Sequence, residues 1–360
     1  ASTGAASTGT VGAGAAPAAV SARRPALTTQ QLAGQRVIFS YSGLTPPDSL
    51  LQQISAGEAA GVIFFGENIS SDSQIASVVK QLNDANASSP VQQPLLLMTD
   101  QEGGEVRRLS GQPTLSEKQI GESSDPASAA AQAGTGAGQN LAGVGMNVNL
   151  APVLGVYREA GDFLDQYQRS YSSDAKVVRD CGREFIQAQQ ATGVAATAKH
   201  FPGLGAATAS QNTDAGPVTL DVSLSDLRAI DELPYQDVVA YGTKLVMCSW
   251  AVYPALDTTN PAGLSSAIVQ GELRDRLGFK GVTITDALEA GSISSFGSTG
   301  QLGVLAAGAG MDLILASARD VAQGQDVISG LVSALGSGTL GQSAFNASVN
   351  RISSLRASLS

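Results

Sequence analysis

The sequence contains very few of the residues on which metal and disulfide chemistry depend. It has one histidine, His200, and two cysteines, Cys181 and Cys248, in 360 residues. A histidine-rich metal site is therefore excluded, and the cysteine spacing has no metal-site character. We expect two separate buried thiols, with a disulfide as the alternative if the protein is exported. No metal or organic cofactor is predicted.

Long apolar runs and an excess of positive charge are also lacking. No stretch approaches the roughly 20 uninterrupted apolar residues that a membrane-spanning helix needs. Lys and Arg number 21 against 31 Asp and Glu, a net charge of −10. An acidic surface repels phosphate backbones, so nucleic acid is not an expected partner. Hydrophobic residues still make up 43% of the chain, enough for a large core.

The first part of the chain has little that could form a core. Residues 1–26 are almost wholly Ala, Ser, Thr, Gly, Val and Pro. This composition predicts a flexible tail over residues 1–30, followed by a single domain over 31–360. The tail favours a spacer left after a signal or lipid-anchor segment was cleaved, and hence a secreted protein or cell-surface lipoprotein of a bacterium. A cytoplasmic protein with a disordered N-terminus is the alternative. We expect a monomer.

Beyond the tail, short apolar runs alternate with segments compatible with helix. The runs are Arg36–Tyr41, Gly61–Phe65, Leu95–Asp100, Asn147–Ala151, Ala195–His200, Leu245–Ser249, Gly281–Asp286 and Asp312–Ala316. The helical segments include Asp72–Asn86, Asp174–Ala191, Leu224–Tyr241, Ser265–Leu277 and Asp320–Leu335. Runs rich in Val, Ile, Leu and Phe are typical of strands buried on both faces. Eight such repeats predict an α/β fold, a single (β/α)8 barrel. No Gly-x-Gly-x-x-Gly turn follows the first run, which disfavours an open doubly wound sheet.

Charged residues interrupt the apolar pattern where three of the predicted strands end. Asp100 and Glu102 follow the third strand, Lys199 and His200 end the fifth, and Asp286 ends the seventh. Burying charges there costs several kcal/mol unless they are paired. Because the carboxyl ends of barrel strands share one face, we expect a converging polar pocket, with rim ion pairs as the alternative. Charged donors and acceptors grouped in this way suit a ligand with many hydroxyls, such as a sugar.

Three segments resemble the β-N-acetylglucosaminidases of glycoside hydrolase family 3. They are T-D-Q-E-G-G-E-V-R-R-L (99–109), A-K-H-F-P-G-L-G (198–205) and L-R-D-R-L-G-F-K-G-V-T-I-T-D-A-L-E-A-G (273–291), with weaker matches at 168–171 and 247–257. The resemblance extends over about residues 31–355 in the family's order. It implies a barrel that hydrolyses β-linked N-acetylglucosamine in cell-wall or chitin-derived glycans, with retention of anomeric configuration.

The resemblance also implies roles for individual residues. Asp286 would be the nucleophile that forms a glycosyl-enzyme intermediate. We expect Lys199 nearby to keep the Asp286 carboxylate ionised at neutral pH. The residues that would hydrogen-bond the sugar are Asp100, Arg108, Arg169, Lys199 and His200.

The chain departs from the family pattern where the general acid is expected. The family's catalytic histidine falls on Asn212 and its partner aspartate on Ser210, and neither residue can transfer the proton. Leu204 and Trp250 replace two further histidines of the family. Three interpretations are open. Asp214 acts as a displaced acid/base on a flexible loop, although it is equally well an ordinary turn residue. Only substrates with good leaving groups are cleaved. Or the barrel binds a sugar or peptidoglycan fragment without hydrolysing it.

Other features give weaker expectations. Glu102 precedes two glycines, and we expect it to anchor the backbone N–H groups of that turn. Arg107 and Arg108 alternate along an extended segment, so only one of them can face the pocket. Tyr167 and Tyr171 are candidates for stacking on a sugar ring, or for ordinary packing. A β-glucosidase-type specificity is disfavoured because those longer enzymes usually carry a second sheet domain.

Overall fold

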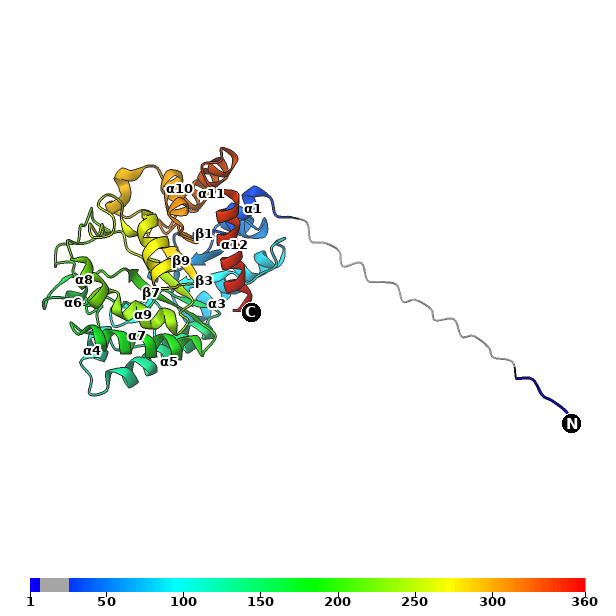
Figure 1. The fold of residues 1–360 in the computed structure, drawn as a ribbon, viewed down its shortest axis with the longest axis horizontal. Helices are drawn as coiled ribbons and strands as arrows, with labels where there is room; N and C mark the ends of the chain where they lie inside the picture. The colour runs from blue at the N-terminus through cyan, green and yellow to red at the C-terminus, as the bar shows by residue number, and fades with distance from the viewer. Residues whose placement is uncertain (7–25, 360) are drawn as a thin grey trace.

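The computed structural model describes residues 1–6 and 26–359, and it contains a parallel sheet surrounded by helices (Figure 1). The sheet has 8 strands. They are β1 Val37–Phe39, β2 Gly61–Ile63, β3 Leu96–Thr99, β6 Val148–Asn149, β7 Ala195–Phe201, β8 Leu245–Cys248, β9 Val282–Thr285 and β10 Ile314–Leu315. Each strand overlaps one of the predicted apolar runs. Most of the predicted tail lies outside the described residues, and helix α1 (Thr29–Gly34) begins inside its predicted limit.

The sheet closes on itself. Its strand order is β10-β1-β2-β3-β6-β7-β8-β9, so β10 pairs with β1. The two ends of this order meet through Leu313, whose N–H donates to Thr283 O at 2.8 Å and whose carbonyl accepts from Thr285 N at 3.0 Å. The predicted (β/α)8 barrel is confirmed.

The helices lie outside the strands. The α-helices besides α1 are α2 Asp48–Ser55, α3 Asp72–Ala87, α4 Glu117–Gly121, α5 Pro126–Gly143, α6 Phe163–Gln166, α7 Ala175–Gln190, α8 Leu224–Asp226, α9 Leu233–Ala240, α10 Thr299–Ala309, α11 Val321–Gly336 and α12 Gln342–Ala357. The 3-10 helices are η1 Gly66–Asn68, η3 Ala262–Leu264 and η5 Gly291–Phe296. The π-helices are η2 Leu227–Asp231 and η4 Ala267–Arg276. None of the described helices is both long and apolar enough to cross a membrane.

Two predicted helices differ from the structure in how they are wound. The segment predicted as Leu224–Tyr241 is divided into α8, the π-helix η2 and α9. The segment predicted as Ser265–Leu277 is the π-helix η4, in which Leu277 N–H donates to Glu272 O, five residues earlier. The periodic pattern therefore located these helices but not their hydrogen-bond spacing. The free thiols of Cys181 on α7 and Cys248 on β8 are both buried, as predicted.

The barrel interior is filled by apolar side chains that alternate along the strands. They are Ile38, Ile63, Leu96, Met98, Val148, Leu150, Ala195, Leu245, Met247, Val282, Ile284, Leu313 and Leu315. Ile352 and Leu355 of α12 belong to the same cluster, so this helix closes the amino-terminal end of the barrel. Figure 1 shows α12 beside α1, and Arg356 joins them by donating to Pro94 O at 2.6 Å and to the side chain of Gln35. The opposite end is left open for a binding site.

One buried carboxylate joins the closing strands to the helices around them. Asp312 has no exposed surface and immediately precedes Leu313. It accepts hydrogen bonds from Arg274 Nη2 at 2.6 Å and Arg351 Nη2 at 2.7 Å, and from Thr283 N at 2.9 Å. The two arginines lie on η4 and α12, so this carboxylate connects β9, η4 and α12 at the seam of the barrel.

Asp312→Asn is expected to lower the free energy of unfolding by about 3–5 kcal/mol, because it leaves two arginines without their anionic partner in a buried site. Urea unfolding followed by circular dichroism measures this. Asp326→Asn on the exposed face of α11 is the matched control and should change stability by less than about 0.5 kcal/mol. Equal small effects of both substitutions would contradict the role of Asp312.

Candidate active site

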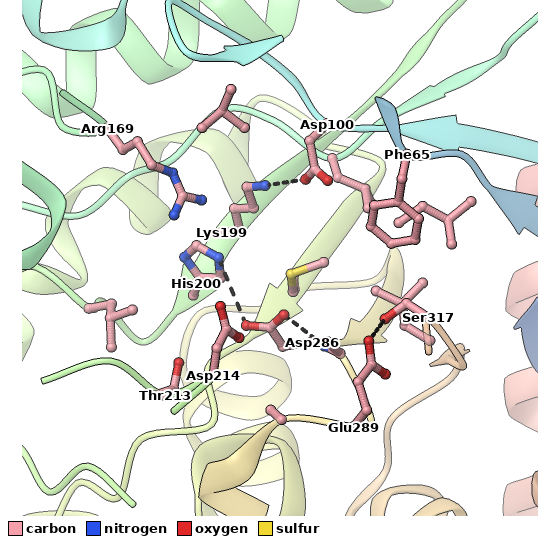
Figure 2. A pocket seen from close by; sticks show the side chains of 18 of the residues that line it. Phe65, Asp100, Arg169, Lys199, His200, Thr213, Asp214, Asp286, Glu289 and Ser317 are labelled. Carbon is pink, nitrogen blue, oxygen red and sulfur yellow. Dashed lines mark hydrogen bonds and ion pairs between the residues drawn. The ribbon is translucent and has the colours of Figure 1, made fainter. Parts of the chain in front are cut away.

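The register of the strands determines which side chains reach the open end of the barrel. Inward-facing residues recur at every second position. Continuing this alternation two residues past the last apolar inward residue gives the first layer above the core. The side chains placed in this way are Phe65, Asp100, Asp286 and Ser317, together with Lys199, which is four residues past the inward-facing Ala195 of β7. All of them line one cavity of about 400 Å³, whose floor is the apolar layer of the barrel (Figure 2).

A bulge in β7 adds a histidine to this layer. Lys199 pairs with Met247 and Phe201 pairs with Cys248, so His200 is one residue more than the neighbouring strand has. Because of the extra residue, the consecutive side chains Lys199 and His200 both line the cavity. Burial, and then the positive charges of Lys199 and Arg169, lower the pKa of His200 well below its usual value. The imidazole is neutral at pH 7, with one donor and one acceptor nitrogen.

The loop after β3 folds back as a short hairpin that carries Glu102. Strand β4 (Gln101–Gly103) pairs antiparallel with β5 (Val106–Arg107). Gly103 has a φ of 118°, and a Cβ added there would lie 2.2 Å from Leu115 O, so the turn requires glycine. The hairpin turns the Glu102 side chain into the protein, where the residue is only 1% exposed.

Glu102 is the centre of a compact group of charges. Arg169 donates Nε and Nη2 to its two carboxylate oxygens, both at 2.8 Å. Lys199 Nζ lies 2.7 Å from Glu102 Oε1 and 2.8 Å from Asp100 Oδ1. Burial alone would raise the pKa of Glu102, but Arg169 and Lys199 outweigh it and hold that pKa below its ordinary value. Two cations and two carboxylates thus balance one another in the cavity wall.

A further buried carboxyl group, that of Glu117, lies behind this wall. Glu117, at the start of α4, is 2% exposed and accepts from Val153 N at 2.8 Å. Burial and the neighbouring Glu102 raise the pKa of Glu117 well above its usual value. Its surroundings therefore disfavour a second negative charge next to Glu102.

Several expectations about the wall are corrected or confirmed by these contacts. The prediction that Glu102 anchors the backbone of the glycine turn was wrong, because its oxygens are occupied by the side chains of Arg169 and Lys199. Arg169 lines the cavity as expected, but two of its donors are used on Glu102. Arg108 also lines the cavity, whereas Arg107 donates to Gly111 O at 2.6 Å, so only one of the pair faces inward.

The aromatic side chains of the cavity are not the tyrosines considered from the sequence. Tyr171 is buried, and half-exposed Tyr167 packs edge-on against Phe163 with ring centroids 5.5 Å apart. Neither tyrosine lines the cavity, and Phe65 and Phe163 do. Phe65 is two residues beyond Ile63, so counting the strand register would have identified it.

The environment of Asp286 differs from the expected one. Lys199 is engaged by Asp100 and Glu102, and the hydrogen bond that Asp286 accepts comes from Ala287 N at 2.7 Å. Burial and the negative charge of Asp214 raise the pKa of Asp286 to about 7, against the opposing effect of Lys199. Lys199 therefore does not hold the pKa of Asp286 at or below its ordinary value, contrary to the expectation from the sequence.

Asp214 lies beside Asp286 in the cavity (Figure 2). Its loop is attached to the loop that follows Asp286, since Gly291 N donates to Asp214 O at 2.9 Å and Ser292 N donates to Thr213 O at 3.1 Å. The side chain of Asn212 accepts from Asp214 N at 2.9 Å and shapes the turn. No movement of the loop is needed to bring Asp214 to the cavity, contrary to the expectation of a flexible loop that delivers it.

The positions of the other absent histidines are occupied by packing residues. Trp250 is buried and donates Nε1 to Ala287 O at 2.8 Å, which supports the backbone next to Asp286. Leu204 lines the cavity. On the opposite side the cavity is bounded by Ser317, Glu289 and Arg319, which the sequence reasoning did not single out. Ser317 follows from the strand register, but Glu289 and Arg319 lie on loops without such a signal.

The arrangement can support chemistry on a polyhydroxylated ligand. His200, Lys199 and Asp100 provide neutral, cationic and anionic partners for hydroxyl groups on one wall. Asp286 and Asp214 provide two adjacent carboxyl groups in different environments, which suits one for attack and the other for proton transfer.

Comparison with known proteins gives consistent matches over almost the whole chain. Residues 30–355 match the family described as the glycosyl hydrolase family 3 N-terminal domain. An uncharacterized secreted glycosyl hydrolase of Arthroderma benhamiae is 47% identical over 345 residues, which are 95% of this chain and 97% of that protein.

Two solved structures are similar in both sequence and fold. A family 3 β-N-acetylglucosaminidase from Paenibacillus sp. has a TM-score of 0.87 at 33% identity, and the match covers 93% of this chain and 63% of that one. A β-N-acetylhexosaminidase from Beutenbergia cavernae has a TM-score of 0.82 at 30% identity, over 92% of this chain and 99% of that one. This chain thus spans less than two thirds of the first of these proteins and nearly all of the second.

The raised pKa of Asp286 predicts a pH-dependent stability. The folded state binds this proton more tightly than the unfolded state does, so ionisation of Asp286 destabilises the fold as pH rises from about 4 through 7. Asp286→Asn removes that cost. We expect the variant to be more stable than the wild type at pH 8, by about 4 kcal/mol, and equally stable near pH 4. Urea unfolding across this range tests it, with exposed Asp275→Asn as control; a gap independent of pH would contradict the assignment.

Proposed function

Because this chain belongs to glycosyl hydrolase family 3, we propose that it is a retaining glycosidase that releases β-linked N-acetylglucosamine from cell-wall or chitin-derived glycans. The observation that carries the proposal is Asp286, which follows β9 in the layer just above the apolar floor of the cavity and has a second carboxyl group beside it. The sugar is suggested by the names of the Paenibacillus and Beutenbergia enzymes.

In the proposed reaction Asp286 is the nucleophile. Its carboxylate attacks the anomeric carbon, a glycosyl-enzyme ester forms, and the glycosidic C–O bond breaks; water then cleaves the ester. The attacking form is the ionised one, and the pKa of Asp286 is raised to about 7 by burial and by Asp214. Activity with low substrate concentrations should therefore increase as pH rises toward and past 7, because kcat/KM reports the free enzyme.

The proposed sugar site is the wall opposite the carboxyl pair. Asp100 accepts from hydroxyl groups, and Lys199 donates to them. Neutral His200 can do both. Arg108 and Arg169 complete the polar lining. Since Lys199 and Arg169 are already oriented by Glu102, they are held in place before a ligand arrives, which favours binding.

Asp214 is the proposed acid/base. The leaving oxygen needs a proton, and Asn212 and Ser210 cannot supply one. Asp214 lines the cavity, and its charge is among the influences that raise the pKa of Asp286. In the proposed first step the charge lies on Asp286 and the proton on Asp214, which is the reverse of the arrangement in which a charged Asp214 raises the pKa of Asp286.

A non-catalytic sugar-binding barrel is the second candidate function. It is favoured by the replacement of the family's histidine and aspartate by Asn212 and Ser210. For location, we propose that the protein is secreted, which is supported by the description of the Arthroderma benhamiae relative and by the Ala- and Ser-rich first 26 residues. The monomeric state remains a prediction.

Turnover of two substrates tests the proposed function. We expect the purified protein to cleave both an aryl β-N-acetylglucosaminide with an activated leaving group and a β-1,4-linked disaccharide of N-acetylglucosamine. Asp286→Asn should abolish both activities, and kcat/KM for the aryl substrate should fall below pH 7. Binding of the disaccharide without cleavage of either substrate would establish the sugar-binding alternative.

The variant Asp214→Asn distinguishes the proposed role of Asp214 from that of Asp286. Loss of the acid should lower hydrolysis of the disaccharide by about 10²–10⁴-fold, and slow the aryl substrate less at its first step because that leaving group needs no proton. Azide should restore turnover of the aryl substrate and give the β-glycosyl azide, which is identified by NMR. Equal losses on both substrates without azide rescue would show that Asp214 is not the acid/base.

A further inference from the structure

The cavity has a closed end and an open mouth. At the closed end, the side chains of Lys199 and His200 are 3% and 8% exposed. At the mouth, Arg319 is 43% exposed. Asp286 lies between these extremes, at 19%. If the closed end holds the sugar that is attacked, the rest of the bound glycan must extend past the side chains at the mouth.

One side of the mouth is an aromatic platform with a cation on it. The Arg319 guanidinium carbon lies 4.0 Å from the centre of the Phe65 ring, and its Nε lies 3.5 Å from Glu67 Oε1. Phe65 also lines the cavity (Figure 2). Apolar faces of sugar rings pack on such surfaces, which combine an aromatic ring with nearby donors.

The backbone of Arg319 is held in an uncommon conformation. Its φ is 62°, in the left-handed region that costs a non-glycine residue about 1 kcal/mol. Its N–H donates to the buried hydroxyl of Ser40 at 2.8 Å, and that hydroxyl donates to Ala316 O at 2.8 Å. Glycine would fit this position without backbone strain. The arginine therefore adds backbone strain at a position where its side chain lines the cavity.

Glu289 forms the other part of the mouth, and it too is fixed. Its carboxylate accepts from Ser317 Oγ at 2.8 Å and from Gln323 Nε2 at 3.2 Å. Gln323 is itself oriented, because its side-chain oxygen accepts from Ala318 N at 2.8 Å. Figure 2 shows the Glu289 carboxylate on the Ser317 side of Asp286. Each carboxylate oxygen retains a free lone pair for a hydroxyl group of a ligand.

The charge at the mouth favours one class of ligand. Asp214, Glu289 and Glu67 are acidic, and Arg319 is the cation that joins them there. Lys199 and Arg169 are paired with carboxylates in the deeper wall, and Arg108 lines the same cavity as a further cation. A ligand carboxylate placed beside Glu289 would be repelled by that fixed carboxylate, whereas an uncharged sugar would not.

We propose that Phe65, Arg319 and Glu289 form a second sugar subsite, which binds the uncharged hexosamine next to the bond that is cleaved and discriminates against a carboxylate-bearing sugar at that position. This inference rests on the proposed function, because the proposed chemistry defines which sugar lies at Asp286. The stacked pair of Phe65 and Arg319 packs against the sugar ring, Glu289 accepts from its hydroxyl groups, and the negative charge of Glu289 repels a lactyl carboxylate. The substrate class is then a chitin-type oligosaccharide rather than one that contains muramic acid.

The test compares three substrates that share the same non-reducing sugar. They are an aryl β-N-acetylglucosaminide, the β-1,4 disaccharide of N-acetylglucosamine, and the β-1,4 disaccharide of N-acetylglucosamine with N-acetylmuramic acid. We expect the wild type to cleave the neutral disaccharide with a kcat/KM at least about tenfold higher than the acidic one. Equal values, or a preference for the acidic disaccharide, would overturn the proposal.

The variants are Glu289→Gln, Phe65→Leu and Arg319→Gly, with Glu58→Gln at the other end of the barrel as matched control. Arg319→Gly suits the left-handed backbone, so folding should be retained, and thermal unfolding checks this. Glu289→Gln should raise kcat/KM for the acidic disaccharide relative to the neutral one by about tenfold. Phe65→Leu and Arg319→Gly should lower kcat/KM for the neutral disaccharide more than for the aryl substrate. Changes that are equal for all three substrates would overturn the subsite.

Failure of the proposed function can be told apart from failure of this inference. If the wild type cleaves no substrate, calorimetry of the neutral disaccharide and of N-acetylglucosamine alone replaces kinetics. The subsite then requires tighter binding of the disaccharide, and a loss of that difference in Glu289→Gln but not in Glu58→Gln. Equal affinities for one and two sugars in the wild type would overturn it.

Discussion

The site depends on a single buried carboxylate, that of Glu102. It lies on the hairpin after β3, and it orients Arg169 from the loop after β6 and Lys199 from the end of β7. Three separate parts of the chain are therefore held by one group. A buried charge of this kind is tolerated only when its partners are in place. The hairpin after β3, the loop after β6 and the end of β7 therefore stabilise one another through Glu102. The polar wall is consequently formed before any ligand binds.

The strand pattern was sufficient to predict the barrel and the face on which the polar residues gather. Asp100, Lys199 and Asp286 were located because each is a charged residue that interrupts the apolar pattern where a predicted strand ends. What could not be predicted was how charges are shared in three dimensions. Lys199 forms an ion pair with Glu102, which the sequence did not indicate. The charge with the largest effect on the pKa of Asp286 is that of Asp214. Glu289 and Arg319 lie on loops, where no periodicity relates a residue to the cavity.

The segment around Asn212 departs from the family pattern, but specific hydrogen bonds define its conformation. Asn212 uses its side chain to stabilise the turn that carries Asp214, and Gly291 allows the two loops to approach closely: a Cβ at Gly291 would lie 2.7 Å from Ala215 O. The backbone hydrogen bonds between this turn and the loop after Asp286 hold Asp214 beside Asp286 in the cavity. In the proposed reaction this attachment positions the proton donor in place of the family's histidine.

The helix that closes the barrel has a consequence for how the protein is made. Interior residues such as Ile38 pack in the same cluster as Ile352, and Arg356 bonds to the side chain of Gln35, separated by 321 residues. During synthesis the apolar interior therefore stays uncovered until the ribosome has released nearly the whole barrel sequence. Such a late-closing chain offers a long interval in which it is unfolded, which suits passage through a narrow translocation channel but also exposes it to aggregation and to chaperones.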